Sequence, residues 1–466
     1  MSKIKFGTDG WRAIIAEDFT VENLKRVSKG TADWMKEKYP NQAVVIGYDC
    51  RFNGKYFADV VASVFAHEGI KAIVSLSFVS TPVVSLVTKR LEAGCGIIIT
   101  ASHNPPEYSG FKIKGNYGGP ALPHMIDEVE ALVPDVYDAN IASLGDHIEA
   151  KSIEYVDMES IYVLHAEENF DLNAIKNSHI RIGYDAMYGA GQNVVKRLLP
   201  NAFMMHSEFN PSFRGTAPEP IMKNLQALSN HIVENKNIDF AFATDGDADR
   251  IGVLNRKGEF IDSHHIILML VKYLKEIKGL SGKVVNSFSC TSKITDLCNQ
   301  LKIEQTVTKI GFKYICGHMI DEDVLLGGEE SGGIAVTNHI PERDGVWIAL
   351  TLLEYMAKTN KKLEELIQEV YDAVGQFAME RYDLHVEENL KQRIIQQAKT
   401  TGFEKFGKYK VNSSDDTDGF KYHLDNGRWV MLRASGTEPV LRVYSEAENS
   451  EIAFDILNEA KEALLN

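Results

Sequence analysis

Short apolar runs alternate along this chain with longer stretches in which apolar residues recur three and four positions apart. The apolar runs are Ala43–Gly47, Gly96–Thr100, Ile180–Tyr184, Phe240–Ala243 and Val284–Phe288. The longer stretches are Val21–Lys38, Phe57–Gly69, Gln192–Leu199 and His265–Lys278. The runs predict strands and the stretches predict helices. Strands that alternate with helices indicate a mainly parallel α/β fold, in which functional sites gather at the carboxyl ends of the strands.

The length of 466 residues corresponds to about three domains at roughly 150 residues each. The helical pattern is interrupted near residue 150, and a turn follows the apolar run Ile251–Leu254. A long helical pattern from Val346 to Val370, with a polar break near Lys358–Lys362, ends before Gly375. These interruptions predict a division into residues 1–150, 151–256, 257–374 and 375–466. The last segment has strands predicted at Trp429–Arg433 and Leu441–Ser445 and a terminal helix, which is the pattern of an α+β module.

The formal net charge of −15 restricts the partners of the chain. Such a charge repels nucleic acid and acidic membrane surfaces, and no dense basic block in the sequence reverses it locally. We therefore expect neither nucleic acid nor a membrane as a partner. The same charge disfavours anionic small molecules, so an enzyme acting on phosphates would have to gather arginines and lysines at its site.

The five cysteines are an odd number without a Cys-x-x-Cys pair, which argues against a disulfide framework and against a zinc site. The first residues lack the charged and apolar pattern of a signal peptide, and no apolar run reaches about 18 residues. We expect a cytoplasmic protein.

A loop that follows the run Gly96–Thr100 has the sequence Ser-His-Asn-Pro-Pro at positions 102–106. An exposed hydroxyl beside hydrogen-bond donors is what a covalent phosphoryl carrier needs, so Ser102 and His103 are candidate catalytic residues. Lys112 follows closely and could act as a general acid or base, or as a charge partner of the loop. The alternative is a plain turn, because Ser, Asn and Pro all favour turns.

Asp245, Asp247 and Asp249 alternate with other residues between the apolar runs Phe240–Ala243 and Ile251–Leu254. Three carboxylates in a tight loop repel one another unless a cation lies between them, and oxygen ligands suit magnesium, manganese or calcium. The loop lacks the glycine and the glutamate of an EF-hand, which excludes a calcium sensor of that type. A solvated acidic turn is the alternative interpretation.

Two further segments combine glycines with polar side chains. In Gly327–Gly333, Glu329, Glu330 and Ser331 stand among glycines that allow close backbone approach, which suits hydrogen bonding to sugar hydroxyls, and Arg343 adds positive charge nearby. The second segment offers arginine donors and loop amides that can bind a phosphate. Its candidate residues are Arg433, Ser435, Gly436, Thr437 and Arg442. Plain glycine-rich turns are the alternative in both cases.

Taken together, in this order and over nearly the whole chain, these four segments resemble the α-D-phosphohexomutase superfamily of phosphoglucomutases, phosphomannomutases and phosphoglucosamine mutases. The segment Phe6–Arg12 is similar to the opening segment of that family, whose arginine reaches the catalytic site. The resemblance implies three similar mixed α/β domains and a fourth, TATA-binding-protein-like α+β domain around one cleft. It also implies phosphoryl transfer between the 1- and 6-positions of a hexose phosphate, through a phosphoserine and a hexose 1,6-bisphosphate.

The resemblance implies roles for particular residues. Ser102 would carry the phosphoryl group, and one magnesium ion would be held by the serine phosphate and by Asp245, Asp247 and Asp249. Glu329, Glu330 and Ser331 would contact the sugar. The phosphate of the substrate would be bound by Arg433, Ser435, Gly436, Thr437 and Arg442. The positive charge that the site requires would come from Arg12, Lys112, Arg250, Arg343, Arg433 and Arg442. The four predicted domains would then carry the phosphoserine, the metal, the sugar-binding loop and the phosphate-binding loop in that order.

The sugar is best predicted from the loop around Glu330. The resemblance implies a phosphoglucomutase there, because dual-specificity mannomutases usually carry Met and glucosamine mutases Gln at this position. Against this, Gly333 stands where dual-specificity enzymes have His, and Gly332 stands where animal-type phosphoglucomutases have Phe. The segment Thr437–Pro439 has the bacterial mannomutase form. We expect glucose as the sugar, with mannose and then glucosamine as alternatives.

Two other classes of protein stay open. A phosphatase of the haloacid-dehalogenase type would use Asp245 as its nucleophile, but that motif has Thr where Asp249 stands. A non-catalytic sugar-phosphate-binding protein is disfavoured because Ser102, His103 and the three aspartates are all present. Hydrolysis of a hexose phosphate without isomerisation would indicate the phosphatase. Binding of a hexose phosphate without turnover would indicate the non-catalytic binding protein. The sequence gives no oligomeric state.

Overall fold

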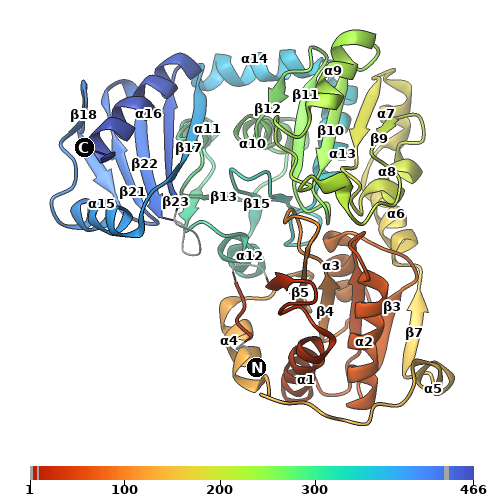
Figure 1. Cartoon of the computed structure of the whole chain (residues 1–466). Helices are drawn as coiled ribbons and strands as arrows, with labels where there is room; N and C mark the ends of the chain where they lie inside the picture. The colour runs from red at the N-terminus through yellow and green to blue at the C-terminus, as the bar shows by residue number, and fades with distance from the viewer. Residues whose placement is uncertain (1–3, 8–9, 435–439, 466) are drawn as a thin grey trace.

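The computed structural model describes residues 4–7, 10–434 and 440–465. Figure 1 shows the N-terminal unit in red and orange at the bottom, the green unit above it, and the blue C-terminal unit at the left. Within the described ranges, no helix has both the length and the apolar character that crossing a membrane requires.

The first sheet has the strand order β1-β5-β4-β2-β3-β7, with β6 paired to β5. Its strands are β1 (Trp11–Ile14), β2 (Val44–Tyr48), β3 (Ala72–Ser75), β4 (Cys95–Ile99), β5 (Tyr108–Gly115), β6 (Gly119–Pro120) and β7 (Ile153–Val156). The helices of this unit are α1 (Val21–Lys38), α2 (Gly54–His67), α3 (Thr81–Arg90), α4 (Pro123–Leu132) and α5 (Leu144–Glu149). The neighbours β4, β2, β3 and β7 run parallel, which confirms the predicted α/β pattern.

Strand β4 shows why the predicted strands are apolar throughout instead of alternating. Ile97 and Ile99 belong to the core that α1 and α2 cover, whereas Ile98 belongs to the core that contains Val84 and Val87 of α3. A parallel strand buried on both faces needs apolar side chains on both. The carboxyl end of β4 then carries the loop of Ser102 to the edge of the sheet.

The second sheet has the order β12-β11-β10-β8-β9. Its strands are β8 (Ile182–Asp185), β9 (Phe203–Met205), β10 (Phe240–Thr244), β11 (Ile251–Asn255) and β12 (Phe260–Ile261). Its helices are α6 (Met158–Asn169), α7 (Leu172–Asn177), α8 (Gln192–Leu198) and α9 (Gln226–Asn235), with a 3₁₀ turn at Phe213–Gly215. Strands β10 and β11 are antiparallel neighbours, so the three predicted metal ligands lie in the loop that joins them.

The third sheet has the order β14-β13-β15-β16. Its strands are β13 (Lys283–Ser287), β14 (Gln305–Thr308), β15 (Val324–Gly328) and β16 (Ile334–Val336). Its helices are α10 (Ser263–Lys272), a π-helical turn (Tyr273–Ile277), α11 (Lys293–Leu301), α12 (Phe312–Asp321), α13 (Gly345–Thr359) and α14 (Leu363–Val374). Helices α13 and α14 divide at the predicted polar break, where Asn360 has a left-handed φ of 54°. Helix α13 packs against β10 and β11, so the second and third units share one core.

The C-terminal sheet is antiparallel, in the order β17-β23-β22-β21-β20. Its strands are β17 (Ala378–His385), β20 (Ser413–Asp415), β21 (Phe420–His423), β22 (Trp429–Ala434) and β23 (Val440–Ala447), beside a small hairpin of β18 (Lys405–Phe406) and β19 (Tyr409–Lys410). Helices α15 (Glu388–Thr400) and α16 (Ser450–Leu465) share the hydrophobic core of this unit with the sheet. The predicted α+β module is confirmed.

The predicted division at residues 150, 256 and 374 stays a prediction. Strand β7 pairs with β3 of the first sheet, and the hairpin of β11 and β12 crosses residue 256 within the second sheet. Strands β7 and β12 therefore lie just past residues 150 and 256, the expected ends of the first and second units.

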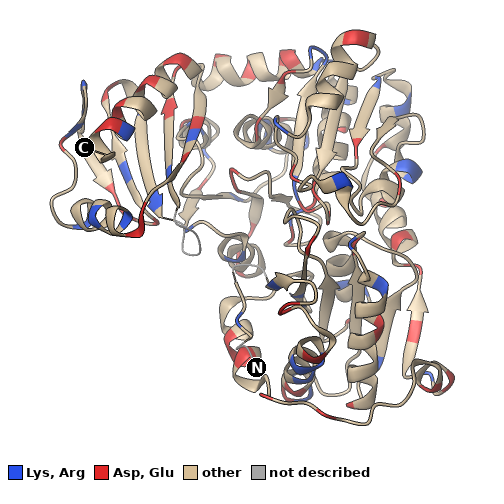
Figure 2. Cartoon of the chain, in the orientation of Figure 1, with Lys and Arg blue, Asp and Glu red and all other residues tan. Residues whose placement is uncertain are grey.

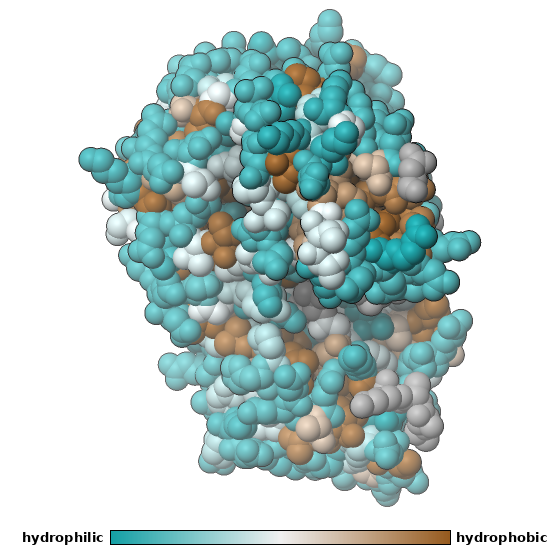
Figure 3. All heavy atoms as spheres, turned by 90° about the vertical axis from the view of Figure 1, so that its left-hand side faces the viewer, coloured by the Kyte–Doolittle hydropathy of each residue, from teal (hydrophilic) through white to brown (hydrophobic). Residues whose placement is uncertain are grey.

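Acidic residues are prominent on the outer helices of this negatively charged chain (Figure 2). Figure 2 shows acidic residues along the outer helices α14 and α16. Figure 3 shows the side that faces left in Figure 1, where hydrophilic residues cover most of the described surface and apolar residues stand in small groups. A phosphate site on this protein therefore depends on local positive charge.

Candidate active site

The predicted site residues come together around one cleft of about 650 Å³, although they lie far apart in the sequence. Those that line it are Arg12, His103, Arg250, Glu329, Glu330, Ser331, Arg343, Arg433 and Arg442. Ser102, Lys112 and the three aspartates are buried close to its floor. The predicted phosphate-binding residues Ser435, Gly436 and Thr437 lie outside the described residues.

Ser102 meets the acidic loop directly. Its Oγ donates a hydrogen bond to Asp245 Oδ2 at 2.7 Å, across the boundary between the first and second sheets. Ser102 also has a left-handed φ of 53°, which costs roughly 1 to 2 kcal/mol for a residue with a Cβ. Strain of this kind persists where the surroundings hold it, and it is concentrated at functional sites.

Asp245, Asp247 and Asp249 form a buried cluster in which one oxygen of each lies within 4.8 Å of the others. Burial, followed by repulsion from Asp247 and Asp249, raises the pKa of Asp245 well above its usual value. Among the described residues, Asp249 Oδ1 is buried without a hydrogen-bond partner. Three carboxylates with an unsatisfied buried oxygen fit a divalent cation with oxygen ligands.

The acidic loop is held by neighbours from three sheets. Lys112 Nζ and Thr81 Oγ1 donate to Asp247 Oδ2 at 2.8 and 2.6 Å, and Arg343 Nη2 donates to Asp249 Oδ2 at 2.6 Å. The backbone of the loop also bonds to Thr81, Ala190 and Gly345, which come from the first, second and third units. The loop is therefore fixed before any ion binds, which is the condition for a preorganised site.

Positive groups surround His103. The charge of Arg250, then burial and the charge of Arg12, lower the pKa of His103 far below its usual value, so its ring is neutral at physiological pH. His103 Nδ1 lies 3.3 Å from Ser102 Oγ, and Arg12 Nη1 donates to Asn104 Oδ1 at 2.6 Å. A neutral imidazole beside the serine can accept or donate a proton.

The loop between β15 and β16 presents two glutamates in different surroundings. Glu329 Oε1 accepts a hydrogen bond from the backbone N–H of Gly311 at 2.9 Å, and burial raises the pKa of Glu329 to about 7. Glu330 Oε2 accepts one from Ser289 Oγ at 2.5 Å. Gly332 is required here, because its φ is +88° and a Cβ would lie 2.5 Å from the carbonyl oxygen of Ile251.

Two arginines of the C-terminal sheet face each other across neighbouring strands. Arg433 on β22 is paired in register with Arg442 on β23, and like charges placed directly opposite are destabilising. Each arginine forms a long ion pair, Arg433 with Asp418 at 3.7 Å and Arg442 with Asp383 at 3.9 Å. An anion in the cleft would relieve this repulsion, which supports the predicted phosphate site.

Three features of the site were not predicted from the sequence. Thr81 supports Asp247, Lys114 Nζ lies 2.8 Å from Glu342 Oε2 in a buried ion pair, and Arg381 on β17 lines the cleft beside Arg442. The partners in these pairs are far apart in the sequence and carry no local motif. Arg381 and Asp383 are two positions apart and lie on the same face of a strand, which is the one visible pattern in the sequence. That pattern fits an exposed ion pair as well as a residue that lines a cleft.

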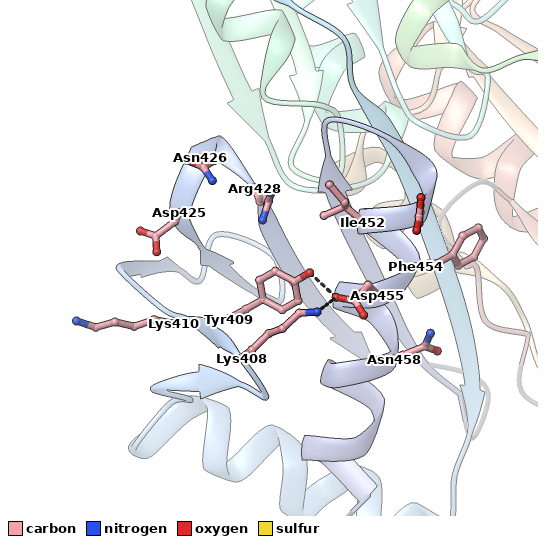
Figure 4. Close-up of a pocket in the computed structure, with 11 residues that line it drawn as sticks. Lys408, Tyr409, Lys410, Asp425, Asn426, Arg428, Ile452, Phe454, Asp455 and Asn458 are labelled. Carbon is pink, nitrogen blue, oxygen red and sulfur yellow. Dashed lines mark hydrogen bonds and ion pairs between the residues drawn. The ribbon is translucent and has the colours of Figure 1, made fainter.

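A second hollow of about 810 Å³ lies on the C-terminal unit, between the hairpin of β18 and β19 and helix α16 (Figure 4). Among the described residues, it shares no lining residue with the cleft. In this hollow, Asp455 forms an ion pair with Lys408 Nζ and accepts a hydrogen bond from the Tyr409 hydroxyl. Arg428 donates a hydrogen bond to Glu448. Lys408 and Arg428 are thus paired with carboxylates at closer range than Arg433 and Arg442 in the cleft.

Comparison with known proteins agrees with this geometry. Models of the phosphoglucomutase/phosphomannomutase family match the chain in series: the alpha/beta/alpha domains I, II and III match residues 3–139, 160–258 and 262–374, and the C-terminal domain matches residues 385–463.

Similar whole proteins carry related names. A phosphoglucomutase/phosphomannomutase of Thermococcus kodakarensis is 30% identical over 97% of this chain and 96% of its own length. A phosphoglucosamine mutase of Carboxydothermus hydrogenoformans is 28% identical over 97% of both chains. A crystal structure assigned to a phosphomannomutase from Thermus thermophilus is 32% identical, covers 100% of both chains and superposes with a TM-score of 0.88.

The fold, the site and these similarities define a phosphohexomutase, an isomerase whose substrates are hexose phosphates. The chain belongs to the phosphoglucomutase/phosphomannomutase family, that is, the α-D-phosphohexomutase superfamily, with its three α/β/α domains and its C-terminal domain.

Proposed function

We propose that this enzyme interconverts glucose 1-phosphate and glucose 6-phosphate through a phosphoserine at Ser102 and a hexose 1,6-bisphosphate intermediate. The observation that carries the proposal is the 2.7 Å contact of Ser102 Oγ with Asp245, inside a buried cluster of three aspartates. A serine joined to a cation site has the arrangement that phosphoryl transfer needs, because positioning and charge neutralisation supply most of the catalysis.

The transfer conserves its groups over one turnover. In the first step the bond between phosphorus and Ser102 Oγ breaks, a bond forms to the free hydroxyl oxygen of the hexose phosphate, and that hydroxyl releases its proton. Ser102 Oγ takes up a proton as it leaves. In the second step Ser102 Oγ gives up that proton and bonds to the other phosphorus of the bisphosphate, the bond from that phosphorus to the sugar oxygen breaks, and the sugar oxygen takes up a proton. His103, which is neutral and 3.3 Å from Ser102 Oγ, and Lys112 are the groups assigned to hold this proton.

The aspartates are assigned to one magnesium ion, together with the serine phosphate. When bound, the ion would neutralise charge on the phosphoryl oxygens, which is the role of divalent cations in this chemistry. Arg12 and Arg250 line the same end of the cleft and are assigned to the oxygens of the transferring group. Arg343 keeps Asp249 in place through its 2.6 Å hydrogen bond.

Glucose is preferred because of the loop that holds Glu329, Glu330 and Ser331. The Ser289 hydroxyl fixes the Glu330 carboxylate at the wall of the cleft, and the Ser263 hydroxyl donates to the Glu330 carbonyl at 2.5 Å. A fixed acceptor favours one arrangement of sugar hydroxyls over another.

Mannose and glucosamine phosphates are the alternative substrates. The similarity to enzymes named for both glucose and mannose, and to phosphoglucosamine mutases, favours them as the second and third candidates. Arg433 and Arg442, with Ser435, Gly436 and Thr437, would bind the phosphate that is not reacting in each case. The cytoplasmic location predicted from the cysteines stays a prediction.

The test is a mutase assay with magnesium and a trace of glucose 1,6-bisphosphate, comparing kcat/KM for glucose 1-phosphate, mannose 1-phosphate and glucosamine 1-phosphate. We expect the highest value for glucose 1-phosphate. Comparable values for mannose 1-phosphate would make the enzyme a dual-specificity mutase, and a higher value for glucosamine 1-phosphate would contradict the assignment of Glu330.

Ser102→Ala tests the carrier in the same assay. It should remove nearly all isomerisation while glucose 1-phosphate still binds, because the covalent carrier is lost and the arginines stay. Ser63→Ala, which removes a hydroxyl on the surface of α2, is the matched control and should leave kcat unchanged. Full activity of Ser102→Ala would overturn the mechanism.

A further inference from the structure

The guanidinium of Arg51 is buried beneath the loop of Ser102 and joins several parts of that loop. Its Nη2 donates to the carbonyl oxygens of Ser102 and Asn104 at 2.7 and 2.6 Å. Its Nη1 donates to those of Pro105 and Tyr108 at 2.8 and 2.9 Å. The side chain is 1% exposed. One planar fork therefore fixes four carbonyl groups of a seven-residue loop.

Asp49 completes this arrangement from the other side of Ser102. Its Oδ2 lies 3.3 Å from Arg51 Nε and accepts a hydrogen bond from Thr100 Oγ1 at 2.6 Å. The same Thr100 Oγ1 accepts the backbone N–H of Ser102 at 2.9 Å. The N–H of Ser102 is thus held through Thr100 and Asp49, and its C=O is held by Arg51.

The direction of these bonds has a consequence for the peptide that follows Ser102. In a planar trans peptide the C=O of one residue and the N–H of the next point in opposite directions. Because the Ser102 carbonyl points to Arg51, the N–H of His103 points away from it. The carbonyls of Asn104 and Pro105 can also turn to Arg51 without burying a donor, because Pro105 and Pro106 have no N–H.

The second unit closes over the same pair. The ring of Phe213 lies 5.0 Å from the guanidinium carbon of Arg51 and is 1% exposed. Gly246 of the acidic loop approaches so closely that a Cβ there would lie 2.5 Å from the Ser102 carbonyl oxygen. Arg51 therefore lies at the joint where the serine of the first unit meets the aspartates of the second.

We propose that Asp49 and Arg51 form the positioning unit of the phosphoryl carrier, holding Ser102 in its left-handed conformation so that Oγ is directed at Asp245. The inference rests on the proposed function, because it assigns the carrier role to Ser102. Among the described residues, neither Asp49 nor Arg51 lines the cleft, so both act through the loop and not on the substrate. A carrier displaced by about 1 Å loses roughly 100-fold in rate.

The test is Arg51→Lys, which keeps the positive charge but cannot bond four carbonyls in one plane. We expect kcat for glucose 1-phosphate to fall about 100-fold while KM changes less than about threefold, because Arg51 itself does not line the cleft and the arginines that bind phosphate are kept. The rate at which glucose 1,6-bisphosphate phosphorylates Ser102 should fall by the same factor. In a Ser102→Ala background, Arg51→Lys should leave the Kd of glucose 1-phosphate unchanged.

Arg26→Lys is the matched control. Arg26 is another buried arginine of the first unit, and it donates to the carbonyl of Pro134 and to Asn23, away from the site. A loss of kcat in Arg51→Lys no larger than in Arg26→Lys would overturn the proposal, as would a rise in KM that matches the fall in kcat. An active Ser102→Ala enzyme would overturn the proposed function instead, so the two failures are distinguishable.

Thr100→Val provides a second variant if Arg51→Lys does not fold. It keeps the shape of the side chain and removes only the hydroxyl that links Asp49 to the Ser102 N–H. We expect kcat to fall about tenfold at unchanged KM. An unchanged kcat in a folded Thr100→Val enzyme would also overturn the proposal.

Discussion

The corner where Ser102 meets the aspartates and the arginine face of the C-terminal sheet are built in opposite ways. At the corner, Ser102 and the three aspartates are at most 1% exposed, and their hydrogen bonds to Asp245, Lys112 and Arg343 are 2.6 to 2.8 Å long. On the arginine face, Arg433 and Arg442 are partly exposed, and their acidic neighbours stay at 3.7 and 3.9 Å.

The difference corresponds to two tasks within one reaction. In the proposed mechanism, the corner holds the transferring group in one geometry, because a displacement of about 1 Å can lower the rate roughly 100-fold. In the proposed mechanism, the arginine face accepts the phosphate that is not reacting, whether it is on position 1 or position 6 of the sugar. Charges that are not already committed to tight ion pairs suit that second task, since few internal bonds have to break when a phosphate arrives.

The largest expected effect comes from the corner. Asp247→Asn removes one negative charge beside Lys112 and Thr81, and we expect kcat to fall about 1,000-fold with a weaker dependence on magnesium. Initial rates at a series of magnesium concentrations measure both quantities. Asp33→Asn, in a surface ion pair with Lys29, is the control and should leave both unchanged. The same magnesium dependence in Asp247→Asn as in the wild type would contradict the assignment of Asp247 as a metal ligand.

A smaller effect of a different kind is expected on the arginine face. Arg442→Ala would remove the proposed phosphate contact, which is made in the ground state and the transition state alike, so KM should rise about 10- to 100-fold while kcat changes less than about fivefold. Steady-state kinetics with glucose 1-phosphate separate the two constants. The exposed Arg393 on α15 provides the control Arg393→Ala. A loss confined to kcat would mean that this face also positions the reacting group.

The pH dependence of kcat/KM tests the role of Glu329 in the sugar loop. Burial raises the pKa of Glu329 to about 7, so its carboxylate form is lost as the pH falls below that value. If the carboxylate accepts sugar hydroxyls, kcat/KM falls about fivefold between pH 7 and pH 6. Rates of Glu329→Gln over the same range are the control, because the remaining pH dependence then belongs to the substrate phosphate. If kcat/KM of Glu329→Gln falls between pH 7 and pH 6 as much as that of the wild type, the assignment of this pH dependence to Glu329 is contradicted.

The smallest effect is expected where the C-terminal unit joins the third. Lys421 Nζ donates to the carbonyl of Phe288 and lies 4.4 and 4.3 Å from the rings of Phe288 and Trp429, and burial lowers its pKa to about 8. Lys421→Met keeps the apolar stem and loses this bond, so we expect about 1 kcal/mol less stability and less than a threefold change in kcat/KM. Calorimetric unfolding measures the first. A fall in kcat/KM of more than threefold would show that this contact between the two units also positions Arg433 and Arg442.

Much of the fold could be predicted from the sequence, because apolar periodicity is local. The helix predicted at Val21–Lys38 has those bounds in the structure, and the predicted strand at Phe240–Ala243 differs from β10 by one residue. The loops of Ser102 and of the aspartates were predicted to lie at carboxyl ends of strands, and both do. Their meeting in one cleft was implied by the resemblance and not by the pattern.

The supporting residues could not be predicted, for a physical reason. Arg51 follows an apolar strand in a segment that looks like an ordinary turn, and its four acceptors are backbone carbonyls, which every residue has. Thr81 and Asp247 are 166 positions apart, so no short window contains both. Residues that carry chemistry have distinctive side chains, whereas residues that hold them are recognised only by what they touch.

The distance along the chain between Ser102 and Asp245 also sets an order of events while the protein is being made. The two residues are 143 positions apart. At about 5 to 20 residues per second, the aspartate leaves the ribosome roughly 7 to 30 s after the serine. During that interval the growing chain contains the loop of Ser102 but not yet the three aspartates with which it forms the site. We therefore expect each molecule to be made inert and to acquire its reactivity only when the second unit has been synthesised.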